Sequence, residues 1–239
     1  MSGSGFLKQR PGRRAFLAGT AVAAAGLAVP RAASADQGGK SGSPLWRHDD
    51  VALLLIDYQP QTFDGLDGPD PRVVELNARL LARAATALEV PVVLTEVGVA
   101  AGINDPTIPA LLEDLPGIEA VDRSTMDSWE DDTFRQAVEA TGRRKLAVGG
   151  LYSEICVAFP AVHALDDGYD VAFVSDAIAG RSVGAHESAM TRMTKAGATA
   201  SSTVSMVLEW FLDWNSPEAT EIMPILEWYD AELPKLAES

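Results

Sequence analysis

Short, nearly uninterrupted hydrophobic runs alternate along the chain with longer segments of helical periodicity. The runs are typical of strands buried on both faces, and they predict strands at residues 51–56, 91–95, 118–121, 145–148 and 170–176. The periodic segments predict helices at residues 72–88, 109–115, 131–141, 156–165, 186–196, 204–214 and 217–233, the last interrupted near Pro224. Alternating strands and helices with short connections predict an α/β fold of three layers, α/β/α, with a mostly parallel, Rossmann-like sheet.

The first 35 residues differ from the rest of the chain. Arg13-Arg14-Ala15-Phe16-Leu17 is a twin-arginine motif, residues 18–29 form a modest hydrophobic stretch, and Ala33-Ser34-Ala35 is a cleavage pattern. The stretch is too short for a permanent membrane span. Residues 1–35 are therefore expected to be a twin-arginine signal peptide that directs export to the periplasm or cell exterior. A retained membrane anchor and a chance arginine pair are the alternatives.

The remaining chain is expected to be one domain. Residues 36–46 are polar and rich in glycine and serine, which predicts a flexible lead-in. Residues 47–239 then form a single domain that ends in helices from about residue 204. Removing residues 1–35 takes away five basic residues and no acidic ones, so the net charge changes from −15 to about −20. Such a surface argues against nucleic acid and anionic membrane as partners.

Three reactive residues stand at predicted strand ends. Asp57 follows the first strand, Arg123 follows the third, and Cys156 lies in the turn after the fourth, at the start of a helix. Ligands of a parallel sheet bind at the carboxyl ends of its strands, so these side chains are expected to converge. A helix N-terminus favours a thiolate, which makes Cys156 a candidate nucleophile.

Each of these three residues also has a purely structural interpretation. Cys156, the single cysteine, could be an inert core residue. Asp57 could be an ordinary turn residue, and Arg123 could pair with the acidic residues around it on the surface.

The motifs that contain these residues resemble those of the isochorismatase-like cysteine hydrolases, most closely the YcaC-like branch. The similar segments are LLLIDYQ at 53–59, DRSTMDSWED at 122–131 and GGLYSEICVAFPAVHAL at 149–165. The resemblance implies an isochorismatase-like α/β fold and a catalytic trio of Asp57, Arg123 and Cys156. Arg123 occupies the position at which most of the family has lysine. It also implies a homo-oligomer.

The resemblance implies hydrolysis of a small amide-like or related substrate. Cys156 would attack the substrate, Asp57 would take and return its proton, and the cation of Arg123 would offset their negative charge. Backbone N–H groups near Ser153 and Cys156 would stabilise the oxyanion. Trp129, Tyr152 and Phe63 would supply the walls of the substrate pocket.

No metal or cofactor is expected. His48, His163 and His186 are scattered, and no G-x-G-x-x-G follows a strand. Gly180–Gly184 has the form G-x-S-x-G, but it lies in a loop several residues past its strand, which argues against a serine hydrolase.

Two further functional classes remain open, as does the role of the C-terminal aromatics. A catalytically silent binding or assembly protein would fit the arginine at position 123, and a thiol redox protein would fit an exported cysteine, although no second cysteine could resolve a sulfenic acid. The aromatic residues of the last two helices either pack on their own sheet or form a subunit interface. They are Trp210, Phe211, Trp214, Trp228 and Tyr229.

Overall fold

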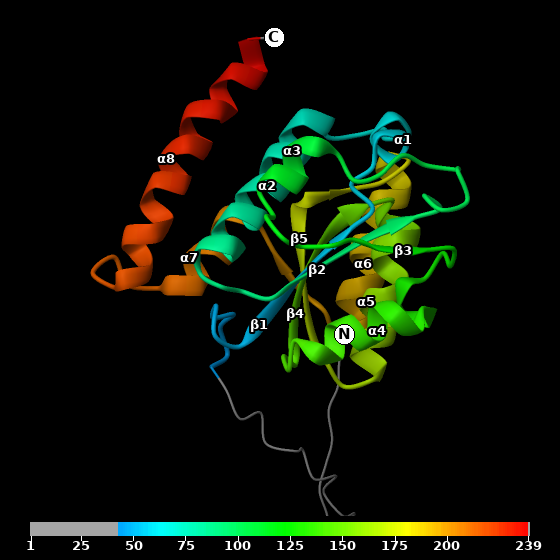
Figure 1. The fold of residues 1–239 in the computed structure, drawn as a ribbon, viewed down its shortest axis with the longest axis horizontal. Coiled ribbons are helices and arrows are strands. Elements are labelled where there is room, and N and C mark those ends of the chain that lie inside the picture. The colour runs from blue at the N-terminus through cyan, green and yellow to red at the C-terminus, as the bar shows by residue number, and fades with distance from the viewer. Residues whose placement is uncertain (1–42, 239) are drawn as a thin grey trace, which may run out of the picture. The chain divides into compact units, whose positions relative to one another are not determined.

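The computed structural model describes residues 43–238. They form one compact unit in which six parallel strands lie between two layers of helices (Figure 1). The predicted three-layer α/β/α architecture is confirmed. The predicted signal peptide, residues 1–35, and residues 36–42 of the predicted lead-in lie outside the described part of the chain.

The strands are arranged in the order β3-β2-β1-β4-β5-β6. Their bounds are β1 Val51–Ile56, β2 Val92–Val97, β3 Val121–Arg123, β4 Lys145–Leu151, β5 Asp170–Ala179 and β6 Thr199–Ser201. The chain builds outward from β1 to β3, then returns to place β4 on the other side of β1, so the order reverses between β1 and β4. Such a reversal opens a crevice at the carboxyl ends of the two strands. The topology therefore places a candidate site beside Asp57 and the turn after β4.

Helices cover both faces of the sheet. Their bounds are α1 Pro60–Asp64, α2 Pro71–Ala87, α3 Pro109–Glu113, α4 Asp132–Ala140, α5 Ala158–Asp166, α6 Val183–Ala196, α7 Thr203–Phe211 and α8 Pro217–Glu238. Figure 1 shows α2, α7 and α8 on one side of the strands and α4, α5 and α6 on the other. Among residues 43–238, no helix has the length and hydrophobicity that crossing a membrane requires.

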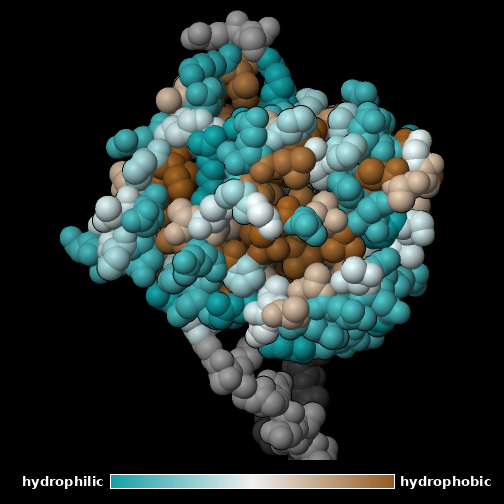
Figure 2. Space-filling model, viewed as in Figure 1, coloured by the Kyte–Doolittle hydropathy of each residue, from teal (hydrophilic) through white to brown (hydrophobic). Residues whose placement is uncertain are grey.

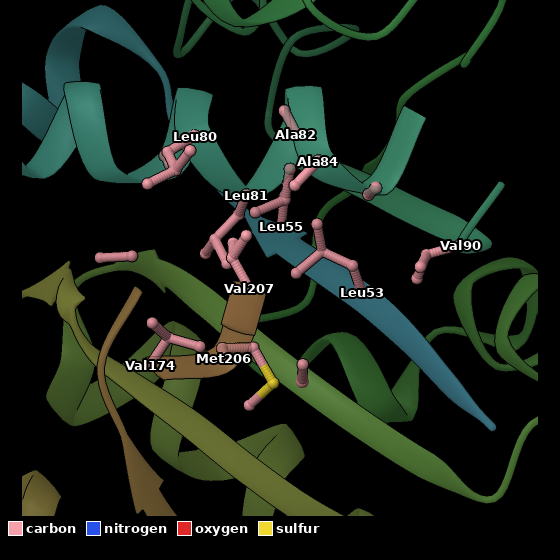
Figure 3. Packing of buried hydrophobic residues seen from close by; sticks show 14 of the residues in the cluster. Leu53, Leu55, Leu80, Leu81, Ala82, Ala84, Val90, Val174, Met206 and Val207 are labelled. Atoms are coloured by element: carbon pink, nitrogen blue, oxygen red, sulfur yellow. The ribbon is translucent and has the colours of Figure 1, made fainter. Parts of the chain in front are cut away.

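Each face of the sheet has its own hydrophobic core, because successive side chains of a strand point to opposite sides. In β1, Leu53 and Leu55 belong to one core, whereas Leu54 and Ile56 belong to the other. Figure 3 shows Leu53 and Leu55 packed among side chains of α2 and α7. The continuous hydrophobic run of β1 thus serves both layers at once and fixes the strand in the middle of the sheet.

The structure changes several predicted boundaries. β4 continues through Gly149 and Gly150 to Leu151. A side chain at residue 150 is excluded by packing, since a Cβ there would lie 2.8 Å from both Cβ and the carbonyl oxygen of Ile56. Helix α8 is not interrupted near Pro224 but runs on to Glu238, so that prediction is wrong.

The α8 helix is held by contacts with α2, which explains why it continues past its proline. The Tyr229 hydroxyl donates to Asn77 Oδ1 at 2.7 Å, and the Arg83 guanidinium lies 3.7 Å from the ring centre of Trp228. Trp210, Phe211 and Tyr229 are buried within their own chain, whereas Trp214 is 62% exposed. Most of the C-terminal aromatics therefore pack on the chain's own core.

The described end of the predicted lead-in is fixed to the domain. Trp46 is buried, and its N–H donates to Glu209 at 2.9 Å. The Lys145 ammonium donates to the carbonyls of Ser43 and Leu45 at 2.7 and 2.8 Å. The ordered domain thus begins by Ser43, before the predicted boundary at residue 47.

Candidate active site

Asp57 follows β1 directly and has a left-handed backbone, with φ 58°. A non-glycine residue held there costs about 1–3 kcal/mol, so its surroundings must enforce it. The Asp57 N–H donates to the carbonyl of Thr95 at 2.9 Å, and its own carbonyl accepts from Thr62 Oγ1 at 2.6 Å. The side chain is completely buried. The backbone is thereby bent so that the carboxyl group faces the interior at the carboxyl end of the sheet.

Arg123 is the last residue of β3 and reaches Asp57 although β2 lies between their strands. Its Nη2 donates to Asp57 Oδ2 at 2.5 Å, and its Nη1 donates to the carbonyl of Thr125. Neither the Arg123 nor the Asp57 side chain is exposed to solvent. The interpretation of Arg123 as a surface ion-pair partner is therefore wrong.

Cys156 lies in a π-helical turn, Ser153–Val157, between β4 and α5. The turn begins at Tyr152, whose backbone is left-handed with φ 54°, and whose carbonyl accepts from the N–H groups of both Ile155 and Cys156 at 2.9 Å. The Cys156 side chain is buried and interacts with Asp57 and with Arg123. The predicted trio therefore comes together, from the ends of β1, β3 and β4.

The electrostatics of the trio favour a neutral thiol at rest. Burial raises the pKa of Cys156 well above its usual range, the Asp57 carboxylate raises it further, and the Arg123 guanidinium only partly opposes them. Burial also raises the pKa of Asp57, against the lowering effect of Arg123. Desolvation and the neighbouring carboxylate therefore outweigh the effect of the helix N-terminus, which by itself favours a thiolate.

The carboxyl group of Asp57 can take the proton that the thiol must lose. Its Oδ2 is engaged by Arg123, while its Oδ1 is buried and has no hydrogen-bond partner of standard geometry among residues 43–238. A buried acceptor without a partner is costly, and it is the natural destination for a proton from the neighbouring Cys156.

The structure places Tyr152 and Ser153 at the site but corrects one predicted oxyanion donor. The Cys156 N–H is already used by the Tyr152 carbonyl. The N–H groups of Ser153 and Glu154 start the helical turn and lack intrahelical partners, so they are the better candidates. The Tyr152 hydroxyl lies against Gly65, where a Cβ would come within 2.1 Å of it.

Trp129 and Phe63 pack against the two hydrophobic cores on opposite faces of the sheet. The indole N–H of Trp129 donates to Asp167, just past the far end of α5, at 2.7 Å, and its ring packs on Tyr169. Phe63 packs beside Tyr58, against the core on the opposite face of the sheet from Cys156. Both aromatics are thus used in packing, and their place in the wall of the substrate pocket stays a prediction.

Two residues that support the site were missed. Gln59 is buried and joins the ends of β1 and β2, since its Oε1 accepts from the Val97 N–H at 2.9 Å. His186 contacts Ser153 from α6. The signal for Gln59 was its place in the Asp-Tyr-Gln motif, whereas nothing in the sequence joined His186 to Ser153.

Other candidate chemistries receive no support from the geometry. Ser182 of the G-x-S-x-G segment caps α6, accepting from the Ala185 N–H at 3.2 Å. In the described part of the chain, no cluster of three His, Cys, Asp or Glu side chains could hold a metal ion.

Comparison with known proteins agrees with this geometry. Residues 51–205 match the Isochorismatase domain family. The chain belongs to this family. The isochorismatase-like chain is 31% identical over 169 residues to the probable hydrolase YcaC of Escherichia coli, covering 70% of this chain and 81% of that one.

Two solved structures show the same fold. The YcaC of Pseudomonas aeruginosa, with hexane-2,5-diol and covalent acrylamide, has a TM-score of 0.72 and 29% identity. The YcaC of Escherichia coli, described as an octameric hydrolase of unknown specificity, has a TM-score of 0.72 and 28% identity. Each comparison covers 82% of this chain and 98% of the other. The resemblance to the YcaC-like branch is confirmed, and the protein is a hydrolase of the isochorismatase family.

Proposed function

We propose that the protein is a cysteine hydrolase of small amide-like or related substrates. Cys156 is the nucleophile, Asp57 accepts and returns the proton, and Arg123 supplies the positive charge that keeps Asp57 in its basic form. The observation that carries this proposal is the buried cluster itself, in which Asp57 interacts with the Arg123 guanidinium and the Cys156 thiol.

The acylation step follows from the positions of the protons. The Cys156 proton passes to Asp57 as sulfur bonds to the substrate carbonyl carbon, and the carbonyl electrons move to oxygen. The N–H groups of Ser153 and Glu154 stabilise that oxyanion. When the C–N bond breaks, Asp57 protonates the departing amine and a thioester remains on Cys156.

The deacylation step reuses the same groups. Asp57 removes a proton from water as the water oxygen attacks the thioester carbon. The C–S bond then breaks, the acid leaves, and the proton returns to the Cys156 sulfur. Arg123 cannot act as the proton carrier, because a guanidinium does not lose its proton in proteins.

The site favours a small substrate. Only 4% of Cys156 is exposed, and Asp57 is fully buried, so a bulky group could not approach the sulfur in this conformation. The covalent acrylamide in the P. aeruginosa YcaC structure is a small amide of this size class. Small neutral amides are therefore the first substrates to test.

The test is ammonia or amine release from a panel of small amides, with Cys156→Ser as the matched control. The proposal expects turnover by the wild-type protein and loss of about 100-fold or more in the variant. Peroxide consumption without amide turnover would instead support the thiol redox protein. Neither activity, with tight binding of one of the amides, would support the silent binding protein.

We also propose that the protein is a homo-oligomer and is exported by the twin-arginine route. Figure 2 shows a hydrophobic patch over the region where Figure 1 places α3, β2 and β3. Large hydrophobic residues of these segments that are not fully buried are Val92, Val97, Leu112 and Val121. Such a patch suits a subunit interface, and the E. coli YcaC is octameric. Light scattering on residues 36–239 should give a multiple of the subunit mass.

A further inference from the structure

A buried hydroxyl links the nucleophile turn to α6. Ser153, the first residue of the π-helical turn, is completely buried. Its Oγ lies 3.2 Å from Glu154 Oε2 and 3.2 Å from Nδ1 of His186, in the first turn of α6. The turn that carries Cys156 is thus hydrogen-bonded to α6, which begins more than 20 residues further along the chain.

The two residues that follow β5 leave room for this network and bind to it. Gly180 has no side chain to fill the space, and a Cβ there would lie 2.6 Å from Ser153 Oγ and 2.8 Å from Glu154 Oε2. The next residue, Arg181, donates its N–H to Glu154 Oε1 at 3.3 Å. Glu154 is therefore held from two sides, and the hydroxyl between it and His186 has little freedom.

The chemistry of the groups fixes the direction of the hydrogen bonds. A Glu154 carboxylate can only accept, so the Ser153 hydroxyl donates to it. The hydroxyl oxygen must then accept from His186, which assigns the proton to Nδ1. Burial lowers the pKa of His186, against the opposing effects of Glu154 and Glu187, so the ring is neutral at pH 7.

We propose that His186 is a positioning residue for the nucleophile. Its Nδ1–H donates to the Ser153 hydroxyl, which in turn donates to Glu154, and this chain holds the π-helical turn so that the Cys156 thiol stays against Asp57. The proposal rests on the proposed function only in taking Cys156 as the nucleophile. Cys156 follows Ser153 by three residues in a tight turn, so a rotation at Ser153 displaces both the thiol and the free N–H groups. Displacements of about 1 Å at a reacting atom can cost 100-fold in rate.

The test uses the reactivity of the single cysteine, which needs no substrate. The pH dependence of Cys156 alkylation by iodoacetamide is measured by mass spectrometry for the wild type, His186→Ala, His186→Asn and Ser153→Ala. Asn places an N–H donor where Nδ1 stands, and His48→Ala, at a partly buried histidine beside Glu218, is the matched control. Melting temperatures are recorded for every variant.

The two alanine variants should lower the pH midpoint of alkylation by about one unit or more, because the thiol moves away from Asp57. His186→Asn and His48→Ala should keep the wild-type midpoint, and the double variant His186→Ala, Ser153→Ala should match the single ones. On an amide that the wild type hydrolyses, His186→Ala should lower kcat about tenfold or more.

An unchanged midpoint in both alanine variants would overturn the positioning role, whatever happens to the melting temperature. So would an asparagine variant that behaves like alanine. Shifted midpoints in a protein that hydrolyses no amide would instead contradict the proposed function and leave the positioning of the thiol supported.

Discussion

At the scale of single residues, the Asp57–Arg123 pair is arranged for chemistry more than for stability. Neither side chain reaches water, and removing two charges from water costs several kcal/mol for each ion. Arg123 donates to Asp57 and to Thr125, but its Nε has no partner within residues 43–238. A pair of hydrophobic residues would fill the same space at a lower cost in folding free energy. The buried ions instead keep a basic carboxylate beside the thiol.

Arg123→Gln should move the acid limb of the pH profile to higher pH. Activity needs ionised Asp57, whose pKa is already raised by burial and is lowered by Arg123. Removing the cation raises that pKa further, so Asp57 becomes protonated, and activity is lost, at a higher pH than in the wild type. The measurement is kcat/KM against pH.

Arg123→Lys provides the comparison for that experiment. The lysine charge should keep the acid limb of the pH profile near its wild-type position. A single ammonium cannot reproduce the guanidinium's contacts, so kcat/KM should fall about tenfold. An acid limb that did not move in the glutamine variant would contradict the assignment of Asp57 as the base.

Cys156→Ala should abolish turnover and leave the fold intact. The change removes only the sulfur atom from a buried position, which should cost about 1 kcal/mol in the free energy of unfolding. Asp57→Asn keeps the shape but cannot accept the proton, and should lose about 100-fold or more in kcat. Denaturant unfolding and amide turnover are measured on the same samples. If Cys156→Ala lost turnover only in proportion to its loss of folded protein, Cys156 would be a structural cysteine.

The trio could be predicted, whereas the packing contacts of the predicted pocket aromatics could not. Asp57, Arg123 and Cys156 follow hydrophobic runs, and the carboxyl ends of parallel strands share one edge of a sheet. The sequence does not indicate which side chains Trp129 contacts. Its placement depends on contacts with Asp167 and Tyr169, about 40 residues away in the chain.

At the scale of elements, the site depends on the absence of side chains near the end of β4. Gly149 and Gly150 of β4 pair with Leu55 and Ile56, at the end of β1 that leads into Asp57. A Cβ on Gly149 would lie 2.7 Å from the Tyr58 hydroxyl. Two successive glycines therefore leave room for Tyr58, which follows Asp57, and for Val157, which follows Cys156.

Gly150→Ala should destabilise the protein by about 1–3 kcal/mol and lower turnover. The added methyl group would lie 2.8 Å from the backbone oxygen of Ile56 and 2.9 Å from Val157, and backbone atoms cannot move aside cheaply. Gly184→Ala is the control, because a Cβ there meets nothing within 4 Å and alanine favours the α6 helix by about 0.5–1 kcal/mol. Urea unfolding compares the two. A Gly150→Ala variant with the wild-type free energy of unfolding would show that β1 and β4 can move apart at no cost.

Long elements with clear periodicity were predicted well, and short ones were not. The strand β1 has its predicted bounds, and α2 differs by one residue at each end. β6 and α1 were missed, since three and five residues carry too little periodicity. The π-helical turn has no sequence pattern of its own. α8 passes Pro224 because packing on α2 outweighs the local cost of a proline.

At the scale of the whole molecule, the net charge and the twin-arginine motif can be read from the sequence and do not depend on the fold. Without residues 1–35 the chain carries a net charge of about −20, which keeps it soluble and repels anionic surfaces. Because the chain has one cysteine, the proposed export would require no internal disulfide to form. A twin-arginine route, which carries folded proteins, suits such a domain. The subunit number cannot be predicted from the sequence, because it depends on the complementarity of surfaces from separate chains.

Replacing both Arg13 and Arg14 by lysine should stop export while leaving the folded domain active in the cytoplasm. The change keeps the charge and the hydrophobic stretch, so a signal that depended only on those would still work, whereas a twin-arginine signal needs the arginine pair. Cell fractionation with mass spectrometry should find wild-type protein beginning at Asp36 outside the cytoplasm and the variant, intact, inside. Arg31→Lys, which lies beyond the motif, should be exported normally. Export of the double variant would contradict the twin-arginine route, and an exported wild type that retained Met1 would contradict cleavage after Ala35.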